Sequence, residues 1–514
     1  MKNLATIFFV LLLVVSACHN VKHQQESKGN AIKETNGNYT FAAPLSSQKP
    51  SGQYQHNAES MDMPHPGDRY AETTENAFMN VEKDPISTFS IDADGAAYAN
   101  MRRFLQDDKR IPPADAIRTE EMLNYFDMGY GFDGGDEAIA LNGEVSDCPW
   151  EKSHKLVRIG IQGKPLDKDN IPPSNYVFLI DVSGSMSTED KLELLKGGFI
   201  DFVDQMSEED RIAIVTYAGS AGVILQSTSG QDKAKIKRAI KSLGSGGSTA
   251  GAQGIITAYE IAEANFIRGG NNRIILGTDG DFNVGPSDTE SLIEMIEEKR
   301  ESGMFLTVLG VGRGNLNDAM LEQLANKGNG TYEYIDCINQ LRKVFIQDAS
   351  KFFAVAKDVK VQIKFAPESV ESYRLIGYEN RVLATEDFTD DTRDAGEIGA
   401  GQGITALYEI VPVKREFKRD PVLSVDFRYK APDSKTSKPL SLVIMDEGNS
   451  FARSSEQMRV AASVAAFSLI LRDSEYKGEM NLEDVLRWSK GAISFDPYGF
   501  KTEFRSLVKT ASGI

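Results

Sequence analysis

From residue 175 onward, short apolar segments alternate with longer amphipathic segments, and this alternation constrains the fold more than any other feature of the chain. Short apolar segments bounded by polar residues predict strands, and apolar residues that recur every three or four positions predict helices. The predicted strands are residues 176–180, 212–217, 274–276 and 305–311, and the predicted helices are residues 192–206, 233–243, 249–266, 289–302 and 317–327. Strands separated by helices predict an α/β fold with a doubly wound, mostly parallel sheet.

Polar residues gather in three loops of this predicted sheet. Asp181 follows the first strand, and Ser183 and Ser185 come next on a tight turn that contains a glycine. Thr249 ends a glycine-rich loop at the start of a helix, and Asp279 comes after a later strand. Doubly wound sheets bind ligands at the carboxyl ends of their strands, so we expect these side chains to converge there. Carboxylate and hydroxyl oxygens suit Mg²⁺ or a similar hard cation better than zinc.

These five residues resemble the metal-ion-dependent adhesion site of von Willebrand factor type A domains. That family's pattern is Asp-x-Ser-x-Ser, a distant Thr and a distant Asp, and all five positions occur here in that order. The resemblance implies that Ser183, Ser185 and Thr249 contact the ion directly, and that Asp181 and Asp279 act directly or through water. It also implies an open coordination position for a carboxylate of a partner protein. The expected cofactor is Mg²⁺, with Mn²⁺ or Ca²⁺ as alternatives.

The histidines of the chain argue against several kinds of catalysis. The last of the five histidines is His154, so the later part of the chain lacks the residue needed for Ser-His or Cys-His catalysis and for His-ligated zinc, unless His154 reaches in. Carboxylates are then the general bases available near the predicted metal site. We therefore expect a binding protein and not an enzyme.

The amino terminus reads as an export signal. One positive charge, Lys2, precedes an apolar segment at residues 7–15, which is too short to span a membrane comfortably. The following Val15-Ser16-Ala17-Cys18 resembles the lipobox of bacterial lipoproteins, and the alternative is an ordinary signal with a chance cysteine. The resemblance implies that Cys18 carries lipid chains and anchors the protein to a membrane of the cell envelope, at the outer membrane or the cell surface.

The segments on either side of the type A domain resemble the modules of a bacterial group, the YfbK-like family. The resemblance rests on the sequences at residues 90–98, 118–126, 394–401 and 405–409. The expected organisation is a lipoprotein signal peptide at residues 1–17, a flexible linker at 18–80, an amino-terminal YfbK-like module at 81–150, the type A domain at 174–353 and a carboxy-terminal YfbK-like module at 354–514.

Local patterns predict the structure of these modules. Asp92-x-Asp94-Gly95 lacks the later ligands of a calcium loop, so we predict that Asp94 caps a helix. Strand-like alternation predicts a β-rich region at residues 359–365, 407–411 and 422–429, with which residues 156–161 are expected to pair. The glycines at residues 396–401 predict a turn or bulge because no Lys and no helix follow. Residues 458–511 predict a packed helical cap.

Composition limits the possible partners. The formal net charge of −18 argues against nucleic acid. Cys148 and Cys337 could form a disulfide or remain buried thiols. The leading hypothesis is metal-dependent protein binding at the envelope, and the alternative is a structural or assembly scaffold in which the metal only stabilises the fold.

Overall fold

The structure is a computed structural model that describes residues 67–514, apart from 92–93, 168–170, 219, 248–250, 281–285, 392–394 and 414–419. Cys18 and Thr249 therefore lie outside the described residues. The described residues belong to one compact unit.

The predicted parallel sheet is present. Its six strands are β5 (Ser174–Asp181), β6 (Arg211–Ala218), β7 (Ser220–Ser229), β8 (Asn271–Thr278), β9 (Met304–Val311) and β10 (Tyr332–Ile335). The strand order is β10-β9-β8-β5-β6-β7, and only the pairing of β7 with β6 is antiparallel. All four predicted strands are confirmed. The sequence prediction missed β7, an edge strand, and the short strand β10.

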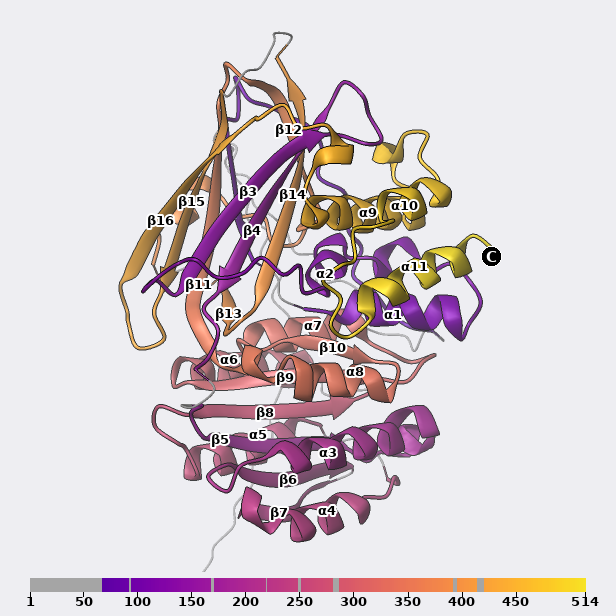
Figure 1. The fold of residues 1–514 in the computed structure, drawn as a ribbon. Coiled ribbons are helices and arrows are strands. Elements are labelled where there is room, and N and C mark those ends of the chain that lie inside the picture. Colours follow the sequence, from indigo (N-terminus) through magenta and orange to yellow (C-terminus); the bar gives the residue numbers. More distant parts are fainter. Residues whose placement is uncertain are drawn as a thin grey trace, which may run out of the picture. The chain divides into compact units, whose positions relative to one another are not determined.

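Helices cover both faces of this sheet (Figure 1). On one face lie α3 (Leu194–Gln205), α4 (Lys233–Lys241) and α8 (Ile338–Arg342), and on the other lie α5 (Gly251–Ala264), α6 (Pro286–Glu301) and α7 (Asp318–Lys327). Each face has its own apolar core. Phe178 of β5, for example, packs on Phe199 of α3 with ring centroids 4.2 Å apart. This helix–sheet–helix layering confirms the doubly wound fold.

A β-sandwich is built from segments on both sides of this doubly wound domain. One antiparallel sheet has the order β1 (Met79–Asn80), β12 (Val370–Ile376), β14 (Gly403–Pro412), β4 (Lys155–Gly163) and β3 (Ile139–Asp147). The facing sheet contains β13 (Gly396–Gly399), β11 (Ala354–Phe365), β15 (Pro421–Lys430) and β16 (Ser437–Met445), and β2 (Ile86–Ser90) pairs with β11. The expected pairing of residues 156–161 with the later region is confirmed. The direct partner is β14, and β11 faces β4 across a shared core.

Five helices form a further apolar core beside the sandwich: α1 (Ala96–Gln106), α2 (Thr119–Asn124), α9 (Glu456–Leu471), α10 (Leu482–Trp488) and α11 (Phe500–Ala511). The predicted helical cap is thus confirmed, and amino-terminal helices join it. Within the described ranges, each helix is too short or too polar to cross a membrane.

Two local predictions were wrong. Asp94 does not cap α1: its Oδ1 accepts a hydrogen bond from the Tyr332 backbone N–H at 2.8 Å, because the chain delivers this carboxylate to the edge of β10 instead. The linker was expected to stay flexible through residue 80. However, Asp68 and β1 pack on the folded unit, since tertiary hydrogen bonds compensate for the low apolar content of this segment.

The structure also decides two further expectations, for the glycine-rich segment and for the two cysteines. The glycine-rich segment at residues 396–401 pairs irregularly with β11 and turns at Gly401, whose φ is +72°, so the predicted turn or bulge is confirmed. Cys148 and Cys337 are both free thiols in the described chain.

Candidate metal site

The candidate site lies where β5 and β8 end. Asp181 is the last residue of β5, and Asp279 directly follows the last residue of β8, Thr278. The two strands are parallel neighbours in register, with Ile180 beside Gly277, so their carboxyl ends lie side by side. Both carboxylate side chains are fully buried. The structure therefore brings together two acidic residues that are 98 positions apart in the sequence.

Asp181 is held by neutral donors. Its Oδ1 accepts a hydrogen bond from the Ser183 backbone N–H at 2.8 Å, and its Oδ2 accepts one from the Thr278 hydroxyl at 3.1 Å. Burial raises the pKa of Asp181 above its ordinary value, and the nearby carboxylate of Asp279 acts in the same direction. A cation at this position would therefore stabilise the ionised form of Asp181.

The two predicted serines lie together beside these carboxylates. The hydroxyl oxygens of Ser183 and Ser185 are 3.0 Å apart. Ser185 also forms a hydrogen bond with Asp279 that lowers the pKa of this carboxylate. The short turn after β5 thus turns two hydroxyls toward the strand ends, as the sequence predicts.

Thr249 lies outside the described residues, but the loop before it is described. The Gly246 N–H donates to the Val182 carbonyl at 2.7 Å, and the Gly184 N–H donates to the Gly247 carbonyl at 3.2 Å. These two backbone hydrogen bonds bring the glycine-rich loop next to the serine turn.

Asp279 has a different environment from Asp181. The Lys191 ammonium lies 2.9 Å from Asp279 Oδ2, and the Asn315 side-chain amide donates to the same oxygen at 3.0 Å. Lys191 also donates to Asn315 Oδ1 at 3.0 Å. Although burial, the largest single influence, acts to raise the pKa of Asp279, the Asn315 hydrogen bond and the Lys191 charge lower it overall.

The sequence analysis missed Lys191 and Asn315. Lys191 belongs to a π-helical turn, Glu189–Glu193, where a charged side chain would ordinarily point to solvent. Asn315 follows the end of β9, so the rule that sites form at the carboxyl ends of parallel strands could have found it. No comparable sequence signal marks Lys191.

The donor set fits a hard divalent cation. It offers two carboxylates and two hydroxyls, all of them oxygen donors. Protein zinc sites mostly use nitrogen or sulfur ligands, whereas Mg²⁺ and Ca²⁺ prefer oxygen ligands. Asp181, Ser183, Ser185 and Asp279 are therefore the described residues that could hold Mg²⁺, Mn²⁺ or Ca²⁺.

The loop between β9 and α7 joins this site to the amino-terminal segment. Asp68 Oδ1 accepts hydrogen bonds from the Gly314 N–H at 2.6 Å and the Leu316 N–H at 3.3 Å. Its other carboxylate oxygen accepts a hydrogen bond from Arg103 of α1 at 2.8 Å. The loop that carries Asn315 is thus also held by Asp68 of the amino-terminal segment.

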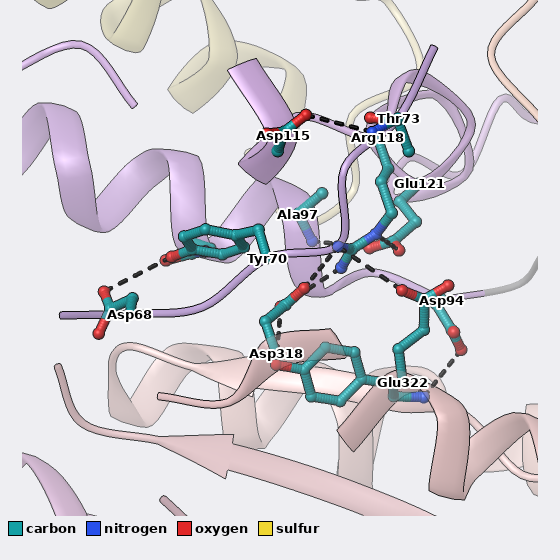
Figure 2. Close-up of polar contacts among 12 residues, drawn as sticks. Asp68, Tyr70, Thr73, Asp94, Ala97, Asp115, Arg118, Glu121, Asp318 and Glu322 are labelled. Atoms are coloured by element: carbon teal, nitrogen blue, oxygen red, sulfur yellow. Dashed lines mark hydrogen bonds and ion pairs between the residues drawn. The ribbon is translucent and has the colours of Figure 1, made fainter. Parts of the chain in front are cut away.

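A buried charge cluster around Arg118 is a second contact between the amino-terminal module and the domain that contains the candidate metal site (Figure 2). The Arg118 guanidinium pairs with Glu121, and it approaches Asp318 Oδ2 at the start of α7 to 2.6 Å. Asp318 also accepts a hydrogen bond from the Tyr332 hydroxyl at 2.9 Å. The amino-terminal module is therefore attached to the type A domain by buried, paired charges.

Comparisons with protein families agree with the observed fold. The model for the von Willebrand factor type A domain matches residues 175–347. A second von Willebrand factor model matches residues 64–158, and the model for the C-terminal region of YfbK matches residues 350–514.

Individual proteins extend the comparison. The human inter-alpha-trypsin inhibitor heavy chain H3 is 28% identical over 35% of this chain and 21% of its own length. The solved structure of a von Willebrand factor type A protein from Catenulispora acidiphila is 16% identical, with 74% of this chain and 91% of that chain covered and a TM-score of 0.41. The uncharacterized protein YfbK of Escherichia coli K12 is 40% identical over 87% of this chain and 81% of its own length. This chain therefore belongs to the YfbK family, and it carries a von Willebrand factor type A domain.

Proposed function

We propose that this protein binds a partner protein through a divalent cation held by Asp181, Ser183, Ser185, Thr249 and Asp279. The observation that carries the proposal is the meeting of two buried carboxylates and two serine hydroxyls at the ends of β5 and β8. Type A domains are protein-interaction modules, which supports binding as the role of such a site.

The cation is proposed to be Mg²⁺, with Mn²⁺ or Ca²⁺ as alternatives, because all the donors are oxygens. When bound, it would supply an open coordination position for a carboxylate of the partner. The chain's own residues orient the donors: Thr278 and the Ser183 backbone hold the Asp181 carboxylate, and Asn315 holds that of Asp279.

We also propose that Cys18 is lipidated and that the protein is anchored in the cell envelope, at the outer membrane or the cell surface. The export signal and the lipobox-like sequence at residues 15–18 support this location. In this proposal the domain organisation expected from the sequence is retained, except that the linker ends near residue 67, where the described contacts begin.

The second candidate function is a structural scaffold in which the metal only stabilises the fold. The Arg118 cluster favours a scaffold role, because its buried ion pairs join the amino-terminal module to the type A domain. Under this alternative, Asp181→Ala would lower the stability of the protein without changing its choice of partner.

Calorimetric titration of Mg²⁺ and Mn²⁺ into the full chain tests the metal site. We expect binding by the wild type and no binding by the Asp181→Ala, Ser183→Ala double variant. The matched control is Asp204→Ala, which removes a carboxylate on the surface of the same domain, far more exposed than Asp181. Absence of binding by the wild type to either ion would contradict the proposal.

A further inference from the structure

Lys191 is a buried cation at the candidate metal site. Its side chain is 7% exposed, and its ammonium lies 2.9 Å from Asp279 Oδ2. Burying an ammonium is costly unless a carboxylate and further acceptors compensate it. Here Asp279 supplies the charge and Asn315 supplies a second acceptor at 3.0 Å. The site therefore already contains one bound positive charge from its own chain.

The Lys191 side chain packs against Gly312. Gly312, directly after β9, has a φ of +76°, and a Cβ added at this residue would lie 2.1 Å from Lys191 Cε. Any larger residue at Gly312 would therefore collide with the aliphatic part of Lys191. The left-handed backbone of Gly312 independently favours glycine. The missing side chain at Gly312 thus leaves room for the lysine.

We propose that Lys191 is a resident cation that competes with the divalent ion for Asp279 and so sets the metal affinity of the site. This inference rests on the proposed function. When both are ionised, Asp181 and Asp279 carry two negative charges, and Lys191 balances one of them. A divalent ion close to Lys191 is repelled by it, and it gains less from Asp279 while the ammonium remains bound there.

The same contacts link Asp279 to the loop between β9 and α7. Lys191 and Asn315, which belongs to this loop, both hold the Asp279 carboxylate. A divalent ion at Asp279 would take the place of the Lys191 ammonium and would weaken its contact with Asn315. Occupancy of the site would therefore be coupled to this loop.

Comparison of the Mg²⁺ affinities of two lysine variants of the full chain tests this inference by calorimetry. Lys191→Met removes the charge and keeps an unbranched apolar side chain. The matched control is Lys237→Met, which removes a lysine from an exposed ion pair with Asp204 in the same domain. We expect Lys191→Met to bind Mg²⁺ at least about ten-fold more tightly, because a like charge beside the ion is removed, and Lys237→Met to bind like the wild type. Equal or weaker binding by a folded Lys191→Met would overturn the proposal.

A second measurement uses the wild type and so does not depend on the folding of a variant. An amine-reactive reagent is applied with and without Mn²⁺, and modification of each lysine is read by mass spectrometry. We expect Lys191 to be protected without metal and to become several-fold more reactive when metal binds, while Lys237 does not change. Unchanged protection of Lys191 at saturating Mn²⁺ would overturn the proposal.

These results separate the failure of the inference from that of the proposed function. If the wild type and Lys191→Met both fail to bind metal, the proposed metal site itself is wrong. If the wild type binds metal and Lys191→Met binds no more tightly, only the role of Lys191 is wrong. If Lys191→Met alone binds, the lysine excludes the ion from the wild-type site, so the role of Lys191 is supported and the proposed metal-dependent function of the wild type is wrong.

Discussion

The Arg118 cluster and the candidate metal site both bury charged groups, but they balance these charges differently. In the Arg118 cluster, Glu121 and Asp318 both contact one guanidinium directly and share its positive charge. At the metal site, Asp279 has Lys191, whereas Asp181 is held by a backbone N–H and a hydroxyl. Charges that are paired within the chain thus join its modules. A buried carboxylate that is held by neutral donors, in contrast, would be stabilised by an external cation.

Removal of the guanidinium from the Arg118 cluster should have the largest effect on stability. Arg118→Met leaves Glu121 and Asp318 buried without their cation, so we expect a loss of about 3–5 kcal/mol in the free energy of unfolding. Urea unfolding of the full chain measures this loss. The control is Arg487→Ala, in an exposed pair with Asp484, which should cost less than about 1 kcal/mol. A similar small cost for Arg118→Met would remove the distinction between the cluster and a surface ion pair.

Neutralisation of Asp181 should separate folding from metal binding. Burial raises the pKa of Asp181, so its ionised form lowers stability at pH 8, and Asp181→Asn should be at least as stable as the wild type in metal-free buffer. At roughly a hundred times the dissociation constant, Mg²⁺ should stabilise the wild type by about 3 kcal/mol and leave the variant unchanged. Thermal unfolding with and without Mg²⁺ measures both effects. A strongly destabilised Asp181→Asn in metal-free buffer would show that this carboxylate is structural, like those around Arg118.

A third carboxylate, Glu333 of β10, extends the comparison to a pH effect. It lines a cavity of about 270 Å³ and accepts a hydrogen bond from the Gln340 side chain at 3.0 Å. Burial, with a contribution from Asp348, raises the pKa of Glu333 to about 7 despite the opposing charge of Lys343. The folded state therefore favours protonated Glu333, and the stability that this provides below pH 4.5 is lost as the pH rises toward 7.

Glu333→Gln should remove this pH dependence. We expect the variant to gain about 1–2 kcal/mol over the wild type at pH 8, less than the full shift implies because the side chain is partly accessible to solvent. The gain should disappear at pH 4. Urea unfolding at several pH values measures it. A difference in the free energy of unfolding that stays constant from pH 4 to pH 8 would mean that the pKa of Glu333 is not raised. The environment of Glu333 would then differ from those of Asp181 and the Arg118 cluster.

The sequence predicted most of what local patterns control. The four internal strands of the type A domain and the helices between them follow from the periodicity of apolar residues, and the structure confirms them. The helical cap follows from the same kind of pattern. The Asp94 prediction was wrong because a capping residue is recognised by its local sequence alone, whereas here a distant strand supplies the hydrogen-bond donor.

The candidate site was predicted in part. The order of Asp181, Ser183, Ser185 and Asp279 along the chain identified four residues that the structure brings to adjacent strand ends, whereas the position of Thr249 stays a prediction. The sequence did not predict the hydrogen bonds of Asp68 with the loop after β9. Its segment is polar and lacks apolar periodicity, so it read as linker, and only the contacts of its backbone and carboxylate with distant residues show that it packs.

The sequence by itself determined the doubly wound fold of the central domain and the polar residues at its strand ends, because periodicity and motif order are local properties of the chain. Only the tertiary structure decided how the charges of these side chains are balanced. Lys191, which packs against Gly312, contacts Asp279, 88 positions away in the sequence. Arg118 contacts Asp318, 200 positions away. The physical reason is that the energy of a buried charge depends on its distance to other charges, and that distance is fixed by packing and not by spacing along the chain.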